Sequence, residues 1–241
     1  NRVIYPNSVP KASQLHLVLV LYMGNDLNRF RLNLHVLPST FDAIVTQIEH
    51  HPVFHNNSCN PQFPVPWQLA IALYQFGHFG NAAAVQSVAQ WAGVSEGLVV
   101  KCTCCVMISI LAMHDDVICW PSTDEKEAAK CWVESESCAR WWNGYCFVDG
   151  TLIPLSQKPG FHGNAYFDRK LNYSLNLQLI SLPNLRIIDY VIGHTGSAHD
   201  STCFQDSHIS KEHESLFSPG EWIWADSAYP VTTWCVPPYQ K

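Results

Sequence analysis

The sequence predicts an α/β fold in which a helical, helix-turn-helix-like N-terminal region is followed by a mixed sheet with helices. Three observations support this prediction. Apolar residues recur at helical spacing up to about residue 120, and short apolar strands replace them from about residue 145. The chain has 241 residues, of which 47% are hydrophobic, so it can bury a sizeable core.

Two segments of the N-terminal region have a helical pattern. "STFDAIVTQIEHH" (residues 39–51) starts with a capping signal at Ser39 and Thr40 and continues with apolar residues three and four apart. After the proline-rich breaker at residues 60–66, "WQLAIALYQFGHFG" (residues 67–80) predicts another helix. The earlier apolar run "LHLVLVLYM" is about half as long as a membrane span and predicts a core segment.

Residues 81–111 have the pattern of a helix-turn-helix. A helix ends at Trp91, Gly93 makes a tight turn, and Ser95 caps a second helix. An ordinary helical hairpin is the alternative. The second helix carries Lys101 as its only cation, which is few for an element that reads the DNA major groove.

The polar segment "PSTDEKEAAKCWVESESCAR" separates the two patterns and predicts a helix capped at Ser122 or Thr123. It is the natural linker. We therefore expect four segments: an N-terminal lead segment (residues 1–35), a helical, helix-turn-helix-like domain (residues 36–120), a connecting helix (residues 121–145) and a sheet domain (residues 146–241).

The C-terminal region predicts strands in a characteristic order. Residues 145–150, 173–181 and 186–196 are three strands, with a hairpin turn at Pro183 and Asn184. A helix-like segment, "HDSTCFQDSHI", and a fourth strand, "EWIWAD" (residues 221–226), follow. The order of three strands, a helix and a strand is typical of a ribonuclease-H-like mixed sheet.

Two of these apolar runs end on an aspartate, Asp149 in "CFVDGT" and Asp226 in "WIWADSAY". By itself, Asp149 before a glycine is a common turn residue. If the two strands are neighbours, however, their carboxylates converge at one edge of the sheet. Paired carboxylates can hold two Mg²⁺ ions about 3.5–4 Å apart for phosphodiester chemistry. Asp149 and Asp226 are therefore candidate metal ligands.

Three further aspartates have competing interpretations. Asp200, which follows His199, is either the N-cap of a helix or a residue beside the metal site. Asp168 is expected to pair with Arg169 or Lys170 in a loop, and Asp189 to point outward from a strand. Only Asp200 is kept as a candidate site residue.

Nucleic-acid contacts must come from local patches, because the formal net charge is −6. Lys158, Arg169 and Lys170 lie between the first two strands, where groups that position phosphates belong, and Lys101 is the fourth candidate. Solvated surface charge is the alternative for all four residues.

Four motifs in order carry a resemblance to a known family: "FVDGTLIPL", "YFDRKLNYSLNLQLI", "GSAHDS" and "WADSAYP". They resemble the DDE superfamily endonuclease domain of PIF/Harbinger-type transposases and their domesticated relatives. The upstream "VAQWAGVSEGLV" resembles the helix-turn-helix that precedes the nuclease in that family. The similarity covers roughly residues 30–241.

The resemblance implies a ribonuclease-H-like fold, Mg²⁺ or Mn²⁺ as cofactor, and cleavage and joining of DNA strands. Asp149 matches the first acid of the family. Asp226 is favoured for the second, and Asp200 matches a motif acid proposed for the same role.

The last catalytic Glu of the family lies on a helix downstream of "WADSAYP", whereas Glu212, Glu214 and Glu221 all precede Asp226. We therefore expect a sheet domain that is incomplete at its C-terminus, a chain from Asn1 to Lys241 that is a fragment, and impaired activity.

The expected function is thus that of a transposase-derived, divalent-metal-dependent DNA endonuclease, and the alternative is a catalytically inactive DNA-binding or protein-interaction module. The expected partners are double-stranded DNA, a separate DNA-binding protein and a second copy of the chain, with no membrane. We expect a nuclear, intracellular protein with reduced cysteines, including the apolar Cys102, Cys104 and Cys105 cluster.

Overall fold

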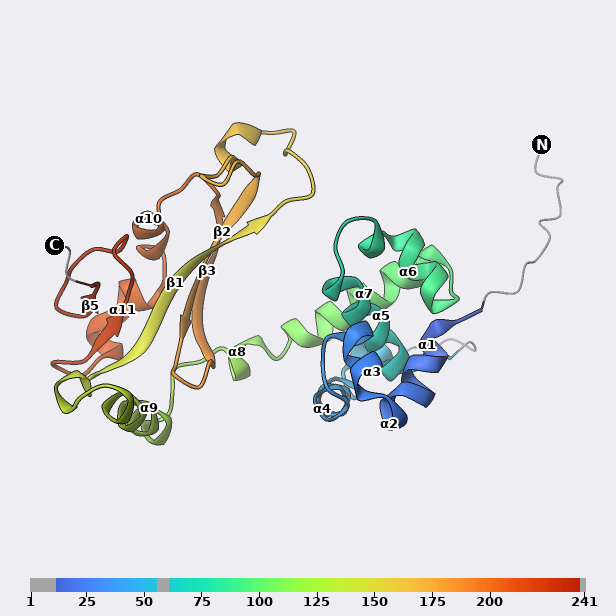
Figure 1. The fold of residues 1–241 in the computed structure, drawn as a ribbon, viewed down its shortest axis with the longest axis horizontal. Helices are drawn as coiled ribbons and strands as arrows, with labels where there is room; N and C mark the ends of the chain where they lie inside the picture. Colours follow the sequence, from blue (N-terminus) through green and yellow to red (C-terminus); the bar gives the residue numbers. More distant parts are fainter. Residues whose placement is uncertain (1–11, 56–60, 239–241) are drawn as a thin grey trace. The chain divides into compact units, whose positions relative to one another are not determined.

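The computed structural model describes residues 12–55 and 61–238, and the chain divides into two compact units, Asn1–His114 and Asp115–Lys241 (Figure 1). Each unit has its own cluster of buried hydrophobic residues. The predicted succession of a helical region and a mixed sheet with helices is confirmed.

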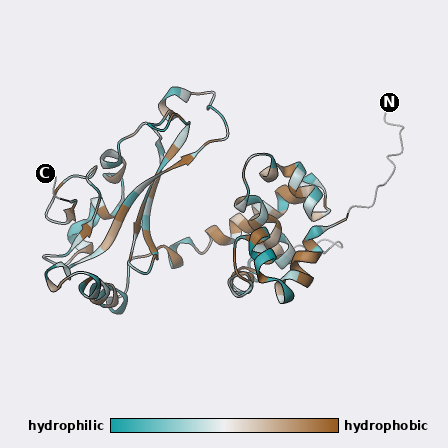
Figure 2. Cartoon of the chain, in the orientation of Figure 1, coloured by the Kyte–Doolittle hydropathy of each residue, from teal (hydrophilic) through white to brown (hydrophobic). Residues whose placement is uncertain are grey.

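The first unit is helical, and hydrophobic residues are prominent along its helices (Figure 2). Its elements are α1 (Gln14–His16), a π-helix η1 (Leu17–Tyr22), α2 (Met23–Asn25), α3 (Leu27–Leu34), α4 (Pro38–Ile48), η2 (Pro52–Phe54), α5 (Val65–Gly77), η3 (Gly80–Ala83), α6 (Val85–Ala92) and α7 (Glu96–Leu111). The short α8 (His114–Val117) spans the division between the units.

One prediction for the first unit is confirmed and one differs. Leu15 and Val18 are buried, so the apolar run "LHLVLVLYM" is a core segment as predicted, and Phe30 of the lead segment joins the same core. Helix α4 begins with Pro38 at its first position and not with a cap at Ser39 or Thr40. Proline suits this position because its fixed φ matches the helix and it has no amide hydrogen to leave unpaired.

Helices α6 and α7 are bent by 97° relative to each other. This is the angle of a helix-turn-helix and not of an antiparallel hairpin. Gly93 ends α6 in the left-handed region with φ of 70°, and the Ser95 side chain accepts a hydrogen bond from the backbone N–H of Leu98.

Across residues 12–55 and 61–238, no single helix is long and apolar enough to cross a membrane. In the same ranges, α6 and α7 reach the length and hydrophobic composition of a membrane span only when the two bent helices are counted together.

The second unit is built around a five-stranded mixed sheet in the order β3-β2-β1-β4-β5. Its strands are β1 (Gly144–Pro154), β2 (Ser174–Ser181), β3 (Ile187–Thr195), β4 (Trp222–Trp224) and β5 (Cys235–Val236). β1, β2 and β3 are antiparallel neighbours, whereas β4 runs parallel to β1, and β5 runs parallel to β4. The predicted ribonuclease-H-like mixed sheet is confirmed, and the two-residue β5 is a strand that the sequence did not predict.

The helices of the second unit are α9 (Thr123–Glu136), η4 (Ala139–Trp141), η5 (Gly163–Tyr166), α10 (Asp200–Phe204) and α11 (His208–Leu216). Phe204 of α10 and Ile209 of α11 join Val148 and Ile180 of the sheet in one buried cluster. The segment predicted as a helix and linker supplies α9, which contributes Ala129 to the same cluster.

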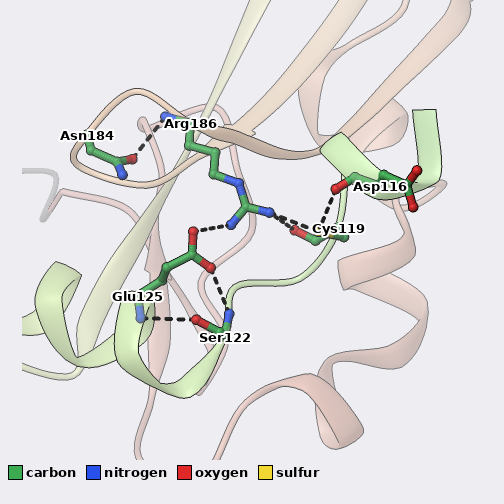
Figure 3. A network of polar contacts seen from close by, with 6 residues as sticks. All are labelled: Asp116, Cys119, Ser122, Glu125, Asn184 and Arg186. Carbon is green, nitrogen blue, oxygen red and sulfur yellow. Dashed lines mark hydrogen bonds and ion pairs between the residues drawn. The ribbon is translucent and has the colours of Figure 1, made fainter. Parts of the chain in front are cut away.

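Helix α9 is fixed at its N-terminus by a polar network (Figure 3). Ser122 and Glu125 form the predicted capping box, in which each side chain accepts a hydrogen bond from the other residue's backbone N–H. Arg186, in the turn between β2 and β3, donates to the Glu125 carboxylate at 2.7 Å and to the carbonyl oxygen of Cys119 at 3.2 Å. These contacts connect the start of α9 to a turn 61 residues further along the chain.

Candidate active site

Asp149 and Asp226 occupy matching positions on two neighbouring parallel strands. The last paired residues of β1 and β4 are Phe147 and Trp224, and each aspartate follows its strand's member of that pair by two residues. Both side chains are exposed to solvent. Because equivalent positions on neighbouring parallel strands lie side by side, the two aspartates are at the same level of the sheet, beyond the last aligned pair of β1 and β4.

Asp149 does not, however, end its strand. β1 continues to Pro154 and remains paired with β2, so the interpretation of Asp149 and Gly150 as a turn is wrong. β4 stops at Trp224, which leaves the outer part of β1 without a neighbour on that side among the described residues. Within the described ranges, β1 is therefore unpaired on the side of β4 from Asp149 onward, because β1 is longer than β4.

Asp200 is held by a buried network of amides on β2. Its Oδ1 accepts hydrogen bonds from Asn176 Nδ2 and Gln178 Nε2, both at 2.9 Å. Gln178 Nε2 also donates to Asn176 Oδ1 at 2.6 Å, and Asn176 and Gln178 are both buried. The N-cap of α10 is His199, so the interpretation of Asp200 as the cap is wrong. The network instead gives Asp200 a fixed orientation next to β1.

Tyr229 closes this network and lies near all three candidate acids. Its buried hydroxyl donates a hydrogen bond to Gln178 Oε1. Burial raises the pKa of Tyr229 far above its ordinary value, and the negative charges of Asp200, Asp226 and Asp149 raise it further, in that order. The three carboxylates are therefore all within electrostatic reach of one buried hydroxyl.

Because Gly150 has no side chain, the carboxylate of Asp200 can lie directly beside it. Substitution of Gly150 by alanine therefore tests the hydrogen-bond network of Asp200 with the β2 amides. A methyl group there would lie 2.5 Å from Asp200 Oδ1 and 2.7 Å from Gln178 Nε2. We expect Gly150→Ala to push these groups apart and to lower the free energy of unfolding by about 1–3 kcal/mol, measured by urea denaturation.

Gly97 provides a matched control in α7, since a methyl group there meets nothing within 4 Å. Gly97→Ala should be neutral or slightly stabilising because alanine favours helices. A Gly150→Ala protein as stable as the wild type would show that the network does not need this space.

A cavity of about 490 Å³ lies beside Asp200. Residues of several segments line it, including Arg169 from the loop between β1 and β2, His199 and Asp200 at the start of α10, Gly150 of β1 and Asn176 of β2. The residues that line the cavity thus include carboxylate, imidazole and guanidinium side chains, and a guanidinium is suited to hydrogen-bonding phosphate oxygens.

Asp168 and Asp189, for which the sequence predicts no role in the site, both have other partners in the structure than expected. Asp168 is buried, and its carboxylate accepts hydrogen bonds from the Ser174 hydroxyl at 2.6 Å and from the backbone N–H groups of Lys170 and Asn172. The bond from Ser174 is the main reason that its pKa is below the ordinary value. Its partners are thus mainly a hydroxyl and backbone amides, and not the side chains of Arg169 or Lys170.

Asp189 does not simply point outward. Its Oδ2 accepts a hydrogen bond at 3.2 Å from the backbone N–H of Ile209, in the first turn of α11, and its Oδ1 accepts one from the N–H of Tyr190. A carboxylate in this position satisfies an amide that has no partner within the helix. Asp189 is therefore a structural residue.

The candidate cations lie in different settings. Lys158, Arg169 and Lys170 are exposed in the loop between β1 and β2, and Lys158 Nζ already donates to Asn164 Oδ1 at 2.7 Å. Lys101 is exposed on α7, where the other exposed side chains include Val100, Met107, Ile108 and Leu111. The exposed surface of α7 is thus mainly apolar, which does not suit contact with DNA phosphates.

The residues present fit a hard divalent cation through the chemistry of their oxygen atoms. Carboxylates are the ligands that Mg²⁺ and Mn²⁺ prefer, and Mg²⁺ commonly uses one or two carboxylates, with water and substrate phosphate oxygens as the other ligands. Within residues 12–55 and 61–238, no group of three His, Cys, Asp or Glu side chains is close enough together to bind a metal. Among these residues, Asp149, Asp226 and Asp200 are thus not gathered into a three-carboxylate site, and a cation held there would need water and phosphate oxygens as further ligands.

The buried partners of Asp200 were missed in the sequence. β2 alternates leucines with Ser174, Asn176 and Gln178, and such a pattern normally turns its leucines to the core. Here the polar residues are buried and the leucines are only partly buried. The alternation of polar and apolar residues shows that β2 has two different faces. It does not show which of the two faces is covered by the rest of the protein.

Comparison with known proteins gives a match in the C-terminal part of the chain. Residues 148–241 match the model of a family described as DDE superfamily endonuclease. No curated protein and no solved structure matches the chain.

Proposed function

We propose that this chain is a transposase-derived, divalent-metal-dependent DNA endonuclease of PIF/Harbinger type, because residues 148–241 match DDE superfamily endonucleases. The reaction would be hydrolysis or transfer of a DNA phosphodiester. The proposed metal ligands are Asp149 and Asp226, and Asp200 is the third candidate acid. A nuclear location follows from this role.

One observation carries the proposal. Asp149 and Asp226 follow the aligned pair Phe147 and Trp224 by the same number of residues on parallel neighbouring strands. Two exposed carboxylates at equivalent positions beside neighbouring strands offer the oxygen ligands that a hard divalent cation prefers. Their position inside the segment that matches the nuclease family makes a divalent cation the natural partner.

The surrounding residues have separate roles in this proposal. When bound, the cation would stabilise negative charge on the phosphate and lower the pKa of water. Asn176 and Gln178 keep the Asp200 carboxylate in one orientation through their two hydrogen bonds. Arg169, beside the same cavity, would bind a phosphate oxygen of the DNA backbone. The side chains thus position the substrate, and the cation supplies the chemistry.

We propose that activity of residues 1–241 is weak. Glu221, one of the nearest acids in sequence, is buried and paired with Lys126 and Lys130, so it is not available as a ligand. With two carboxylates, a second cation would be poorly held.

The second candidate function is a DNA-binding or protein-interaction module without cleavage. Two observations favour it, namely the 97° helix-turn-helix and the lack of a group of three potential metal ligands within the described ranges. As a DNA-binding module, the chain would bind DNA through its positively charged side chains. Substitution of Asp149 and Asp226 would then leave DNA binding intact. A separate DNA-binding protein or a second copy of the chain would then supply specificity.

Cleavage and binding by the wild-type chain separate the two functions. Labelled duplex DNA is incubated with the protein in Mg²⁺, in Mn²⁺ and in EDTA, beside a gel-shift series over a range of salt concentrations. Slow cleavage that requires the metal is the expected result. Binding without cleavage would support the module, and a chain that neither binds nor cleaves DNA would overturn both proposals.

A further inference from the structure

The loop between β1 and β2, residues 155–173, differs in charge from the rest of the chain. The chain has a net charge of −6, whereas the loop has three cations, Lys158, Arg169 and Lys170, and one acid, Asp168. All three cations are exposed, and Asp168 is buried with its carboxylate hydrogen-bonded inside the loop. The charge that this loop presents to solvent is therefore positive, which favours contact with a polyanion.

The same loop exposes large apolar side chains. Phe161 is 79% exposed and Leu171 is 76% exposed, and Phe167 is also exposed. Single exposed hydrophobic residues are common, but an aromatic ring among cations is the combination with which proteins bind single-stranded nucleic acid. The cations follow the backbone and the ring stacks on a base.

Internal contacts hold the loop in a defined conformation. At its base, the backbone N–H of Leu155 donates to the carbonyl oxygen of Tyr173 at 2.7 Å. Lys158 Nζ donates to Asn164 Oδ1 and lies 5.6 Å from the centre of the Tyr173 ring. The Phe161 ring packs edge-on against His162, with ring centres 4.0 Å apart. The exposed ring is therefore presented by an ordered loop, which reduces the entropy lost on binding.

The loop is also attached to the segment that carries Asp200. The carbonyl oxygen of Ala165 accepts hydrogen bonds from the Ser197 hydroxyl at 2.6 Å and from its backbone N–H at 3.3 Å. Arg169 and Phe167 line the 490 Å³ cavity together with Asp200. A DNA strand that reaches the carboxylates would thus also run along the loop, which projects beyond the end of the sheet (Figure 1).

From these observations we infer that residues 155–173 bind DNA at an unpaired base, on which Phe161 stacks, while Arg169 and Lys170 bind the adjoining phosphates. A base inside an intact duplex is covered on both faces by its neighbours, so an exposed phenyl ring can stack only where a base is unpaired or at a strand end. This inference rests on the proposed function, because it names the form of DNA that the same site receives.

Binding is measured with the full chain in EDTA, so that no cleavage occurs. The probes are a labelled single-stranded oligonucleotide, an intact duplex, and a duplex with one unpaired 2-aminopurine, whose fluorescence falls on stacking. We expect Phe161→Ala to weaken binding to the two probes with unpaired bases by roughly 5- to 100-fold and to abolish the fluorescence change. Binding to the intact duplex should be unchanged.

Three variants serve as controls. Phe161→Trp should retain wild-type binding, since it keeps an aromatic ring. Phe79→Ala removes a phenylalanine that is 91% exposed in the helical unit and should bind as the wild type does. Lys170→Ala should weaken binding to all probes and reduce the slope of log affinity against log salt by about 1.

The outcomes separate this inference from the proposed function. A wild-type chain that binds none of the probes would remove the DNA substrate and so overturn both. Wild-type binding that is unaffected by Phe161→Ala would overturn the stacking role alone. Equal loss on the intact duplex and on the unpaired probes would also overturn it, because that result shows no preference for an unpaired base.

Discussion

Replacing Asp149 by asparagine is expected to abolish metal-dependent DNA cleavage and to weaken the binding of Mn²⁺. Asparagine keeps the shape of the side chain and removes its negative charge. Asp149 is exposed and lies within β1, so the substitution should leave the fold intact. Loss of a ligand removes several kcal/mol of charge stabilisation, which corresponds to a fall in cleavage rate of about a thousandfold or more.

Two measurements check this expectation, namely Mn²⁺ titration by calorimetry and the cleavage rate on labelled duplex DNA. Asp226→Asn should show the same loss, and the double variant should be hardly worse than either single variant, since the two carboxylates act together. Asp42→Asn, at an exposed position on α4 of the other unit, is the matched control and should behave as the wild type. Equal Mn²⁺ binding by the wild type and Asp149→Asn would disprove the metal site.

Replacing Glu221 by glutamine is expected to cause a large loss of stability. Glu221 is only 5% exposed, and its carboxylate lies 2.6 Å from Lys126 Nζ and 2.9 Å from Lys130 Nζ, both on α9. Neutralising it removes a carboxylate partner from two largely buried ammonium groups, and Lys130 keeps only the exposed Glu127 as an ion-pair partner among the described residues. Such changes lower the free energy of unfolding by about 3–5 kcal/mol. The melting temperature should fall by roughly 10 °C.

Glu127 supplies the control because it contacts the same Lys130 at 3.2 Å but is 52% exposed. Glu127→Gln should lower the free energy of unfolding by less than about 1 kcal/mol, as is usual for surface ion pairs. Urea denaturation of both variants makes the comparison. Similar losses in the two would show that burial of Glu221 has no special importance.

The same carboxylate gives an expected pH dependence. Burial raises the pKa of Glu221, but hydrogen bonds from Lys126 and Lys130 outweigh it, and the net pKa is below the ordinary value of 4.5. A pKa that is lower in the folded state stabilises the fold above the unfolded-state pKa, and this stabilisation is lost as the pH falls through the folded-state pKa. The wild type should therefore lose stability below about pH 4.5 more steeply than Glu221→Gln, measured by denaturation at a series of pH values.

Local signals in the sequence predicted much of the fold correctly. The capping box at Ser122 and the glycine turn at Gly93 appear in the structure where the sequence places them. Such features depend on residues close together in the chain, so a short stretch of sequence is enough to specify them. The sequence also showed that two apolar runs are each followed by an aspartate, Asp149 and Asp226, but not the register between the two strands.

The environment of Asp200 could not be predicted in the same way. It depends on Asn176 and Gln178, 24 and 22 residues away, and on Tyr229, whose hydroxyl reaches Gln178 across 51 residues. The local alternative for Asp200 was the N-cap of a helix. In the structure His199 is the N-cap, and the Asp200 carboxylate accepts two hydrogen bonds from the side-chain amides of β2.

By itself, the sequence determined that a helical region precedes a mixed sheet, and that two apolar runs are each followed by an aspartate. Only the tertiary structure decided that β1 continues past Asp149, and that β2 turns its polar residues inward. The physical reason is that alternation defines two faces of a strand, whereas burial depends on what packs against each face. Here α10 brings Asp200 to the polar face, and hydrogen bonds to its carboxylate offset the cost of burying two amides.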